Sequence, residues 1–235
     1  MNHKIIFFVR RVACIALLLG PPILAQTIQP LIVEYNGKAG GKFQVTNDTL
    51  MPMAIVMEPK SFSLDNKGWA TYRKLDPGIH LDLSTMSFRL EPKQSYYIFY
   101  KAHADILPAW FTIYAVFSPV RKDEGLQVRI MLPHTVYLYQ KQPIDRKSIE
   151  IKNVVYRPDK KLIACDLENI SQSLIRVQQV RADGGKVPIV AGGFPLLPGS
   201  PRHLEIPWED ATPPSDLLVH FPHFDMKELI SAQSQ

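Results

Sequence analysis

The sequence predicts an all-β protein of two β-sandwich domains, and three observations support this fold class. Apolar residues recur mostly at every second position or in short runs bounded by turn residues, which is typical of sandwich strands. Twenty prolines against twelve glycines disfavour long helices, because proline interrupts the helical hydrogen-bond ladder. A polar, proline-containing stretch at 140–147 separates two groups of such runs and is the expected linker.

The first 25 residues have the features of a secretory signal peptide. Lys4, Arg10 and Arg11 give a basic start, the apolar run 12–19 follows, and Ala25 is a small residue before a polar one. The run is too short to span a bilayer, so we expect cleavage after Ala25 rather than an uncleaved anchor. Cleavage would lower the formal net charge from +5 to +2, because three basic residues and no acidic ones would leave.

Composition and motifs argue against several classes of function. The mature chain carries no basic stripe and no RNA-binding signature, so no nucleic-acid partner is expected. No nucleophile elbow, zinc-protease motif or phosphate loop occurs, so we expect neither catalysis nor a cofactor. Cys165 would be the only cysteine after loss of the leader and should be a small apolar core residue. His220 and His223 would face opposite sides of a strand, so no metal site is expected.

The expected elements follow from the apolar periodicity and the turn signals. The first domain, 26–142, should contain strands at 28–35, 42–46, 53–58, 88–90, 96–101, 110–117 and 126–139, with a polar loop at 118–125. The second, 143–235, should contain strands at 149–156, 161–168, 174–180, 187–190, 203–206 and 217–221. Asp225 and Glu228 have the spacing of a capping box, which predicts a short helical turn there.

The stretch 126–139 is predicted to be the longest strand, and one of its faces is largely apolar. Its even positions are Leu126, Val128, Ile130, Leu132, His134, Val136 and Leu138. Because ordinary strands have ~5–6 residues, this face needs more cover than one neighbour provides, either from its own core or from a partner. Pro133 lacks a backbone donor, so we expect a bulge or kink near Pro133-His134 that divides the strand.

Two short matches indicate that the domains are repeats of one another. Asn47-Asp48-Thr49 follows a predicted strand in the first half, and Asn169-Ile170-Ser171 follows one in the second. Each half later carries leucine, proline and serine in that order, at 90–95 and 197–200. The matches fit duplication of a sandwich.

In this order and spacing, the segments 42–48, 88–92, 121–125 with its flanking strands, 167–169 and 195–200 resemble the periplasmic pilus-assembly chaperones of the chaperone–usher type. The resemblance implies two immunoglobulin-like sandwiches set at an angle, with a cleft between them. It also implies a non-enzymatic role in the periplasm. Such a chaperone lends its G strand to a pilin-like subunit that lacks its last strand, which is a form of β-strand addition.

The resemblance implies roles for individual residues and partners. Val128, Ile130 and Leu132 would be the donor residues that fill pockets in the subunit. The partners would be pilin-like subunits and an outer-membrane usher, and a self-capping dimer of two chaperones remains an alternative. Each buried aliphatic side chain would stabilise the complex by ~1.5–3 kcal/mol.

The sequence departs from the family at the anchor for the subunit's C-terminal carboxylate. Members use an arginine on the first strand and a lysine on the G strand, whereas this chain has Pro30 or Leu31 at the first position and Tyr137 at the second. Tyr137 and Arg129 are the candidate contacts for that carboxylate. Two further basic residues could take the role, namely Lys141 and Arg146.

The missing basic pair keeps a second function class open. An exported adhesion or carbohydrate-binding sandwich would bind through loop aromatics such as Trp69 and Tyr72. A hydrolase on a β-scaffold is a third hypothesis, for which no motif speaks.

Overall fold

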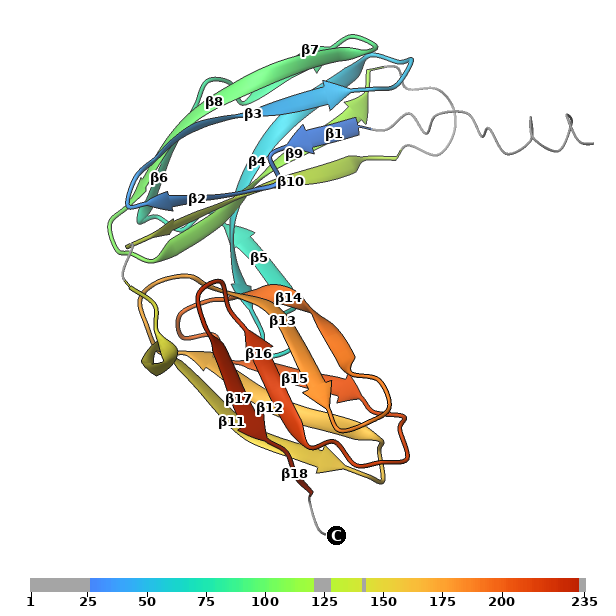
Figure 1. Cartoon of the computed structure of the whole chain (residues 1–235). Helices are drawn as coiled ribbons and strands as arrows, with labels where there is room; N and C mark the ends of the chain where they lie inside the picture. The colour runs from blue at the N-terminus through green and yellow to red at the C-terminus, as the bar shows by residue number, and fades with distance from the viewer. Residues whose placement is uncertain (1–25, 121–127, 141–142, 233–235) are drawn as a thin grey trace, which may run out of the picture.

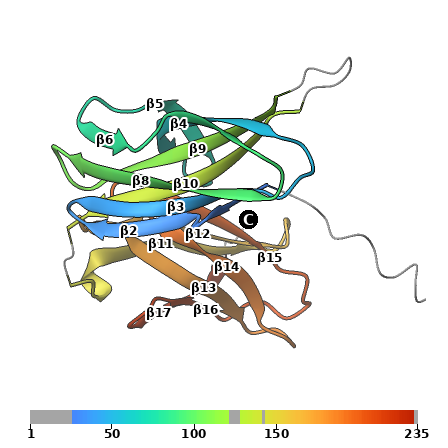
Figure 2. The same cartoon turned by 90° about the horizontal axis from the view of Figure 1, so that it is seen from above.

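The computed structural model describes residues 26–120, 128–140 and 143–232, and these form two β-sandwiches (Figure 1). The all-β, two-sandwich prediction is confirmed. The strands of the two domains form separate groups in both views (Figure 1 and Figure 2). The expected leader and its cleavage site lie outside the described residues, and so does most of the predicted loop 118–125. In the described ranges, no helix has the length and apolar character needed to cross a membrane.

The first domain consists of a four-stranded and a six-stranded sheet. The four-stranded sheet has the order β1 (Gln26–Gln29), β3 (Ala39–Asn47), β8 (Gln94–Ala104), β6 (Ile79–Leu83). The other has the order β2 (Ile32–Asn36), β10 (Ile130–Tyr139), β9 (Ala109–Pro119), β4 (Met53–Leu64), β5 (Ala70–Lys74), and β7 (Ser87–Leu90) also pairs with β4. The pair β2–β10 is parallel, and the other pairs of this domain are antiparallel.

The second domain is a sandwich of two four-stranded sheets. One has the order β15 (Arg202–Pro207), β12 (Leu162–Asn169), β11 (Ile149–Arg157), β18 (Ser231–Ala232). The other has the order β14 (Ile189–Leu196), β13 (Ile175–Asp183), β16 (Asp216–His220), β17 (Asp225–Leu229). A single 3-10 turn, η1 (Arg146–Ser148), is capped by Asp145 and leads into β11.

The helical turn predicted at 225–228 is wrong, because this segment is the edge strand β17. It pairs along its whole length with β16, and His220 Nδ1 lies 2.8 Å from Asp225 Oδ1 across the pair. Met226 is partly buried against the second core, whereas the neighbouring Lys227 is exposed. The free sheet edge therefore outweighs the local capping-box spacing, as tertiary pairing commonly does.

The first predicted strand is also corrected, because 28–35 is two strands in two different sheets. β1 pairs with β3, and after the cis peptide Gln29–Pro30 the chain continues as β2 beside β10. Proline has no N–H to donate to a neighbouring strand. Because Pro30 lies between β1 and β2, neither strand loses a hydrogen bond to it. This crossing determines how much of β10 is covered.

Each domain has its own apolar core. Phe43 and Phe111 are buried in the first, and Trp208 in the second. Cys165 is fully buried in the second core, which confirms its predicted place. Burial raises the pKa of the Cys165 thiol to about 12, so the thiol is protonated at neutral pH.

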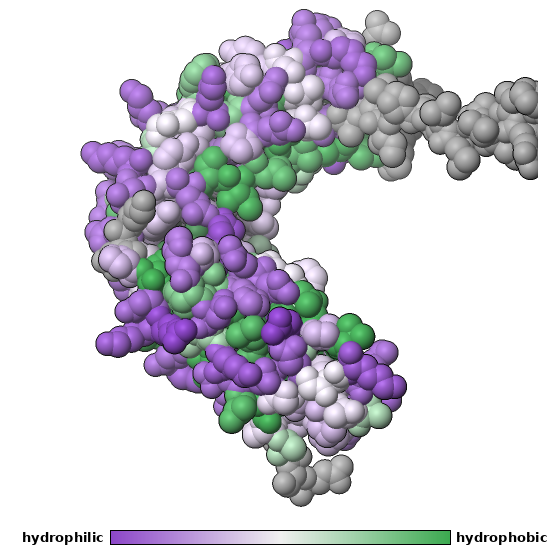
Figure 3. Space-filling model, in the orientation of Figure 1, coloured by the Kyte–Doolittle hydropathy of each residue, from purple (hydrophilic) through white to green (hydrophobic). Residues whose placement is uncertain are grey.

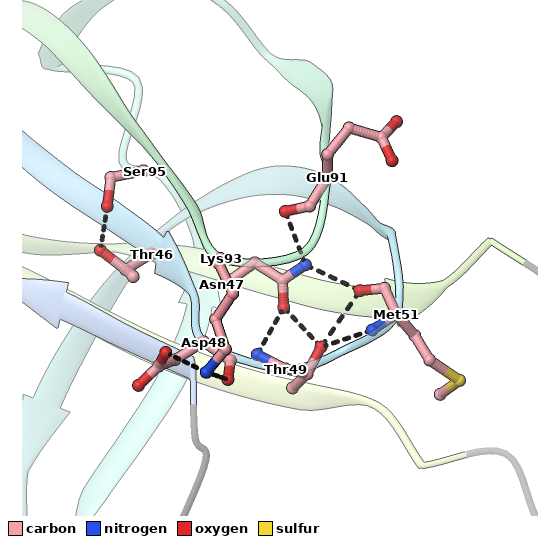
Figure 4. A network of polar contacts seen from close by, with 8 residues as sticks. All are labelled: Thr46, Asn47, Asp48, Thr49, Met51, Glu91, Lys93 and Ser95. Carbon is pink, nitrogen blue, oxygen red and sulfur yellow. Dashed lines mark hydrogen bonds and ion pairs between the residues drawn. The ribbon is translucent and has the colours of Figure 1, made fainter.

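The predicted internal repeat is confirmed by two equivalent buried asparagines. Asn47 Nδ2 donates to Met51 O at 2.8 Å, and Asn47 Oδ1 accepts from Thr49 N at 3.2 Å and Thr49 Oγ1 at 2.6 Å (Figure 4). Asn47 Nδ2 also donates to Leu90 O at 3.3 Å. A further donor contact goes to Glu91 O. One side chain therefore joins the loop after β3 to the end of β7.

Asn169 makes the same set of bonds in the second domain. Its Nδ2 donates to Ser173 O at 2.7 Å and to Leu196 O at 2.8 Å, and its Oδ1 accepts from Ser171 N and Oγ. The leucine contacted is Leu196, one residue before the leucine that the sequence comparison matched. The two domains thus share a fold and an equivalent set of hydrogen bonds from a buried asparagine.

Candidate functional site

The first half of β10 has a strand neighbour on only one side within the described residues. β2 pairs with β10 from Thr135 to Tyr139, and Leu31 O accepts the Thr135 N–H at 2.7 Å. From Ile130 to His134, β10 pairs with β9 alone. Unpaired strand edges are templates for an added strand. This five-residue segment is called the open edge below.

The open edge carries the apolar face that the sequence predicted. Val128 is 57% exposed just before β10, and Ile130 and Leu132 are partly buried against the first core. Further along the same face, Val136 and Leu138 are fully buried. The later part of the face therefore supports the core, and the earlier part leaves apolar area at the edge. Figure 3 shows apolar residues gathered on the side of the first domain that borders the hollow between the lobes.

The β10–β9 register runs without a shift from Ile130 to Leu138, so the predicted Pro133-His134 feature is not a bulge. The backbone direction explains this. Thr135 N–H points away from β9, towards Leu31, and residues two apart in a strand point their backbone groups the same way. Pro133 therefore directs its nitrogen to the open edge, on the side of β10 that faces away from β9. The hydrogen-bond ladder between β10 and β9 needs no donor from this residue.

His134 is a fully buried polar residue where the open edge meets β2. Its Nδ1 lies 2.6 Å from Pro30 O, and its Nε2 lies 3.1 Å from the Tyr100 hydroxyl, which lies 3.1 Å from that of Tyr35. A carbonyl only accepts, so Nδ1 carries the proton and Nε2 accepts from Tyr100. The chain of bonds links β10 to β8 and to both ends of the β2 segment.

Burial lowers the pKa of His134, and the bond to Pro30 O opposes this shift. The imidazole also stacks on Phe43, with ring centroids 4.4 Å apart. A neutral imidazole fits this apolar position because a charged one would lose its hydration without gaining a counter-ion.

The inner end of the cleft is a small apolar cluster that joins the two domains. Phe62 and Tyr137 come from the first domain, and Leu174 and Leu197 come from the second. All four are buried, and Tyr137 is only 5% exposed. Tyr137 therefore lies in the floor of the cleft, in one cluster with apolar side chains of both domains.

An ion pair between the domains lies over this floor. Arg176 on β13 donates from Nε to Glu34 Oε1 on β2 at 2.6 Å, and its guanidinium carbon lies 5.9 Å from the centroid of the Tyr137 ring. Burial raises the pKa of Tyr137, and Arg176 partly opposes that shift. Neither charged residue was predicted from the sequence as part of the site. The signal was Arg176 between the buried Ile175 and Val177 of β13, and it becomes informative only once Arg176 is seen to reach Glu34 on β2.

No protein-family model matches the chain, and no curated protein sequence matches it. Solved structures do match. The class 5 fimbriae chaperone CfaA is 13% identical, with a TM-score of 0.55, over 88% of this chain and 99% of that one.

Two further structures agree. The Salmonella enterica SafA pilin in complex with the SafB chaperone gives 13% identity and a TM-score of 0.60, over 89% of this chain and 98% of the matched chain. The E. coli chaperone DraB gives 15% and 0.54, over 87% and 98%. The chain has the fold of the fimbrial chaperones. The similarity covers both sandwiches.

Within this fimbrial-chaperone fold, the candidate carboxylate contacts do not come together. Arg129 precedes β10 and is exposed, whereas Tyr137 lies eight residues further along, about 27 Å in an extended chain. One carboxylate cannot contact both. Arg146 is exposed on η1, and Lys141 lies outside the described residues.

A second contact between the domains comes from the β4–β5 hairpin, which reaches the second sandwich (Figure 1). His203 N–H donates to Asn66 O at 2.6 Å. Within the second domain, the Arg202 guanidinium lies 5.2 Å from the Phe194 ring. A Cβ on Gly68 would lie 0.9 Å from Arg202 Nη1. The two domains of this fold therefore contact each other at the cleft floor and at the β4–β5 hairpin.

Proposed function

We propose that this chain is an exported periplasmic chaperone that caps pilin-like subunits by lending them the open edge of β10. One observation carries the proposal: within the described residues, a sandwich with the fimbrial-chaperone fold leaves the open edge of β10 without a second strand neighbour, and the apolar side chains of Ile130 and Leu132, with Val128 just before the strand, lie on one face. A subunit that lacks a strand needs both features, backbone hydrogen bonds along an edge and apolar side chains for its open core. No catalytic step is required.

Capture of exported proteins tests the proposal. Tagged wild-type protein and the Val128→Asp, Ile130→Asp and Leu132→Asp variants are used as bait in a periplasmic extract, and captured proteins are identified by mass spectrometry. We expect a small β-rich subunit with the wild type and a loss of at least tenfold with the variants, because a buried carboxylate is strongly unfavourable. Capture of the same subunit by all baits would refute strand donation.

Two controls separate loss of binding from loss of folding. Ile170→Asp changes an exposed apolar residue of the second domain, at 51% exposure, and should leave capture unchanged. Thermal unfolding of each bait monitors stability. Val128→Asp is the most informative variant, because Val128 lies outside the buried core.

We further propose that the cleft floor receives the subunit's C-terminal carboxylate through Tyr137 and Arg176. The supporting observation is that Arg176, on β13, places a guanidinium 5.9 Å from the ring of Tyr137, and Tyr137 stands at the G-strand position where the resemblance expects a lysine. Glu34 occupies this guanidinium in the free chain, so an incoming carboxylate would replace one acidic partner by another. Arg129 is then free to contact the subunit near the open edge.

Substitutions on the two sides of the ion pair test this assignment. Arg176→Gln should weaken subunit capture at least tenfold, whereas Glu34→Gln should keep or strengthen it, because it frees the guanidinium. Arg181→Gln, on the same strand and paired with Asp183, is the matched control and should have no effect. Equal loss with Arg176→Gln and Glu34→Gln would show that the pair only holds the domains together.

An outer-membrane usher is the second proposed partner, and it would receive the chaperone–subunit complex. Assembly of subunits at the cell surface in cells that carry the wild type but not the open-edge variants would support it. An accumulation of stable chaperone–subunit complexes in the periplasm of cells lacking the usher would show that assembly stops at the transfer of the complex to the usher.

The adhesion reading has one observation in its favour, since Trp69 is 73% exposed at the hairpin tip. Tyr72 offers less, because its ring packs against Phe62 and Tyr114. Retention on a glycan surface that is lost in Trp69→Ala and kept in the open-edge variants would favour adhesion over chaperoning.

A further inference from the structure

The open edge of β10 is uneven in its hydrogen-bonding groups. In an extended strand, the N–H and C=O of one residue point to the same side, and successive residues alternate. Because Thr135 directs its N–H to Leu31, Met131 and Pro133 direct their backbone groups to the open edge. Ile130, Leu132 and His134 direct theirs to β9, with which they are in register.

Proline changes what this edge can bind. Met131 offers one donor and one acceptor, whereas Pro133 offers an acceptor only, because it has no N–H. Four backbone bonds would be available at these two residues if both had an N–H, and Pro133 removes one of them. A strand from a different protein that pairs with this edge loses that single bond.

A second copy of the chain would lose twice as much. Two open edges can pair antiparallel with Met131 of each copy opposite Pro133 of the other. Of the four N–H···O=C bonds of such a pair, two need a donor at Pro133 and cannot form. Pro133 therefore removes more hydrogen bonds from a symmetric pair of two open edges than from an open edge paired with a strand of another protein.

The open edge has a reason to need such protection. Met131 is 43% exposed, Val128 is 57% exposed, and no residue from Ile130 to Pro133 carries a charge. Exposed, uncharged apolar edges pair with one another unless a proline, a charge or a bulge prevents it. Within Ile130–Tyr139, Pro133 is the feature of this kind, because the register with β9 has no bulge and the residues 130–133 carry no charge. The exposed Arg129 adds a charge one residue before the strand begins.

We propose that Pro133 is a specificity-determining residue that prevents the open edge from pairing with that of a second copy and leaves it available to a partner strand. The second half of this statement rests on the proposed chaperone function. The first half concerns the chain alone. It weighs against a self-capping dimer formed through paired β10 edges.

The test uses the mature full-length protein without any partner. Sedimentation velocity over a wide concentration series compares the wild type with Pro133→Thr and Pro133→Ala, which restore the backbone donor. We expect the wild type to remain monomeric at concentrations where both variants form dimers or larger species. The self-association constant should rise at least tenfold, since two backbone bonds per pair are regained.

Two further variants identify the surface involved. Pro158→Thr changes an exposed turn proline of the second domain and should sediment like the wild type. Met131→Pro combined with Pro133→Thr again leaves one donor at the edge and should restore the monomer. Amide hydrogen exchange at Met131 should slow in the Pro133→Thr assembly, because its N–H becomes bonded there.

Three results would overturn the inference. Pro133→Thr and Pro133→Ala could both stay monomeric with unchanged thermal unfolding. The Met131→Pro combination could associate as strongly as Pro133→Thr, which would point to another surface. The wild type could itself be a dimer with a slowly exchanging Met131 amide. Dimeric Pro133 variants together with failed subunit capture would reject the proposed function and leave this inference intact. Monomeric Pro133 variants together with successful subunit capture would reject this inference and leave the proposed function intact.

Discussion

Asn47 shows how much of the first domain depends on a single side chain. It is fully buried, and its amide satisfies the carbonyls of Met51 and Leu90 while its oxygen holds Thr49. Removing it would take this donor away from the buried Leu90 carbonyl and this acceptor away from Thr49, and loss of a partner at a buried polar group is the costly form of hydrogen-bond loss. The same reasoning applies to Asn169 in the second domain.

We predict that Asn47→Ala lowers the free energy of unfolding by about 2–4 kcal/mol. Urea denaturation provides the measurement. Asp48→Ala is the neighbouring control, because Asp48 makes an exposed ion pair with Lys93, and its loss should cost less than about 1 kcal/mol. Equal effects of the two substitutions would contradict the role assigned to the asparagine.

His134 makes the stability of the first domain depend on pH. Its pKa is lowered in the folded protein, so the unfolded chain takes up a proton at a higher pH than the folded one. This contribution to stability is complete above the ordinary histidine value of about 6.5 and is lost as the pH falls from there towards the lowered pKa.

We predict that the free energy of unfolding falls on acidification below pH ~6.5, by at most about 1.4 kcal/mol per pH unit from this residue. The difference between the wild type and His134→Gln across the pH series isolates the effect. Identical pH dependence of the two proteins would show that His134 does not titrate differently on unfolding.

At the scale of the element, β10 combines two roles along one strand. From Thr135 onward it is a central strand between β2 and β9, and before that it is an edge. The change occurs next to Pro30, where the chain passes from β1 in the four-stranded sheet to β2 in the six-stranded sheet. The position of this crossing, rather than the apolar pattern of β10 itself, determines the length of the open edge.

We predict alternating amide exchange along β10 in the free protein. Leu132 and His134 should exchange slowly, because their N–H groups face β9, and Met131 should exchange fast, because its N–H faces the open edge. Thr135 should again be slow, since Leu31 O accepts its N–H. Two-dimensional NMR after transfer into D₂O measures this. Uniform protection would mean that the open edge is covered in solution.

At the scale of the whole molecule, two separate contacts hold the domains in their mutual orientation. The first is the cleft floor with the Glu34–Arg176 pair, and the second is the β4–β5 hairpin on β15. Contacts at two points restrict rotation more than a linker alone would. The described geometry of the cleft therefore depends on the hairpin as well as on the linker.

We predict that Gly68→Ala loosens the hairpin contact, because its Cβ would displace the Arg202 guanidinium. Faster exchange of the His203 amide, which is bonded to Asn66, would report the loosening. Gly37→Ala is the matched control: both glycines have positive φ, but Gly37 has open space around it. The control should cost about 1 kcal/mol of backbone strain without affecting His203.

The sequence by itself determined the all-β class, the apolar face of β10, the core position of Cys165 and the asparagine repeat. These depend on period-two alternation and on short spacings, which survive in any arrangement of the strands. Only the tertiary structure decided the split of the first strand at Pro30, the harmless place of Pro133, the strand at 225–229 and the Glu34–Arg176 pair. Each of these depends on which strand lies beside which, and periodicity specifies the face of a residue but not its neighbour.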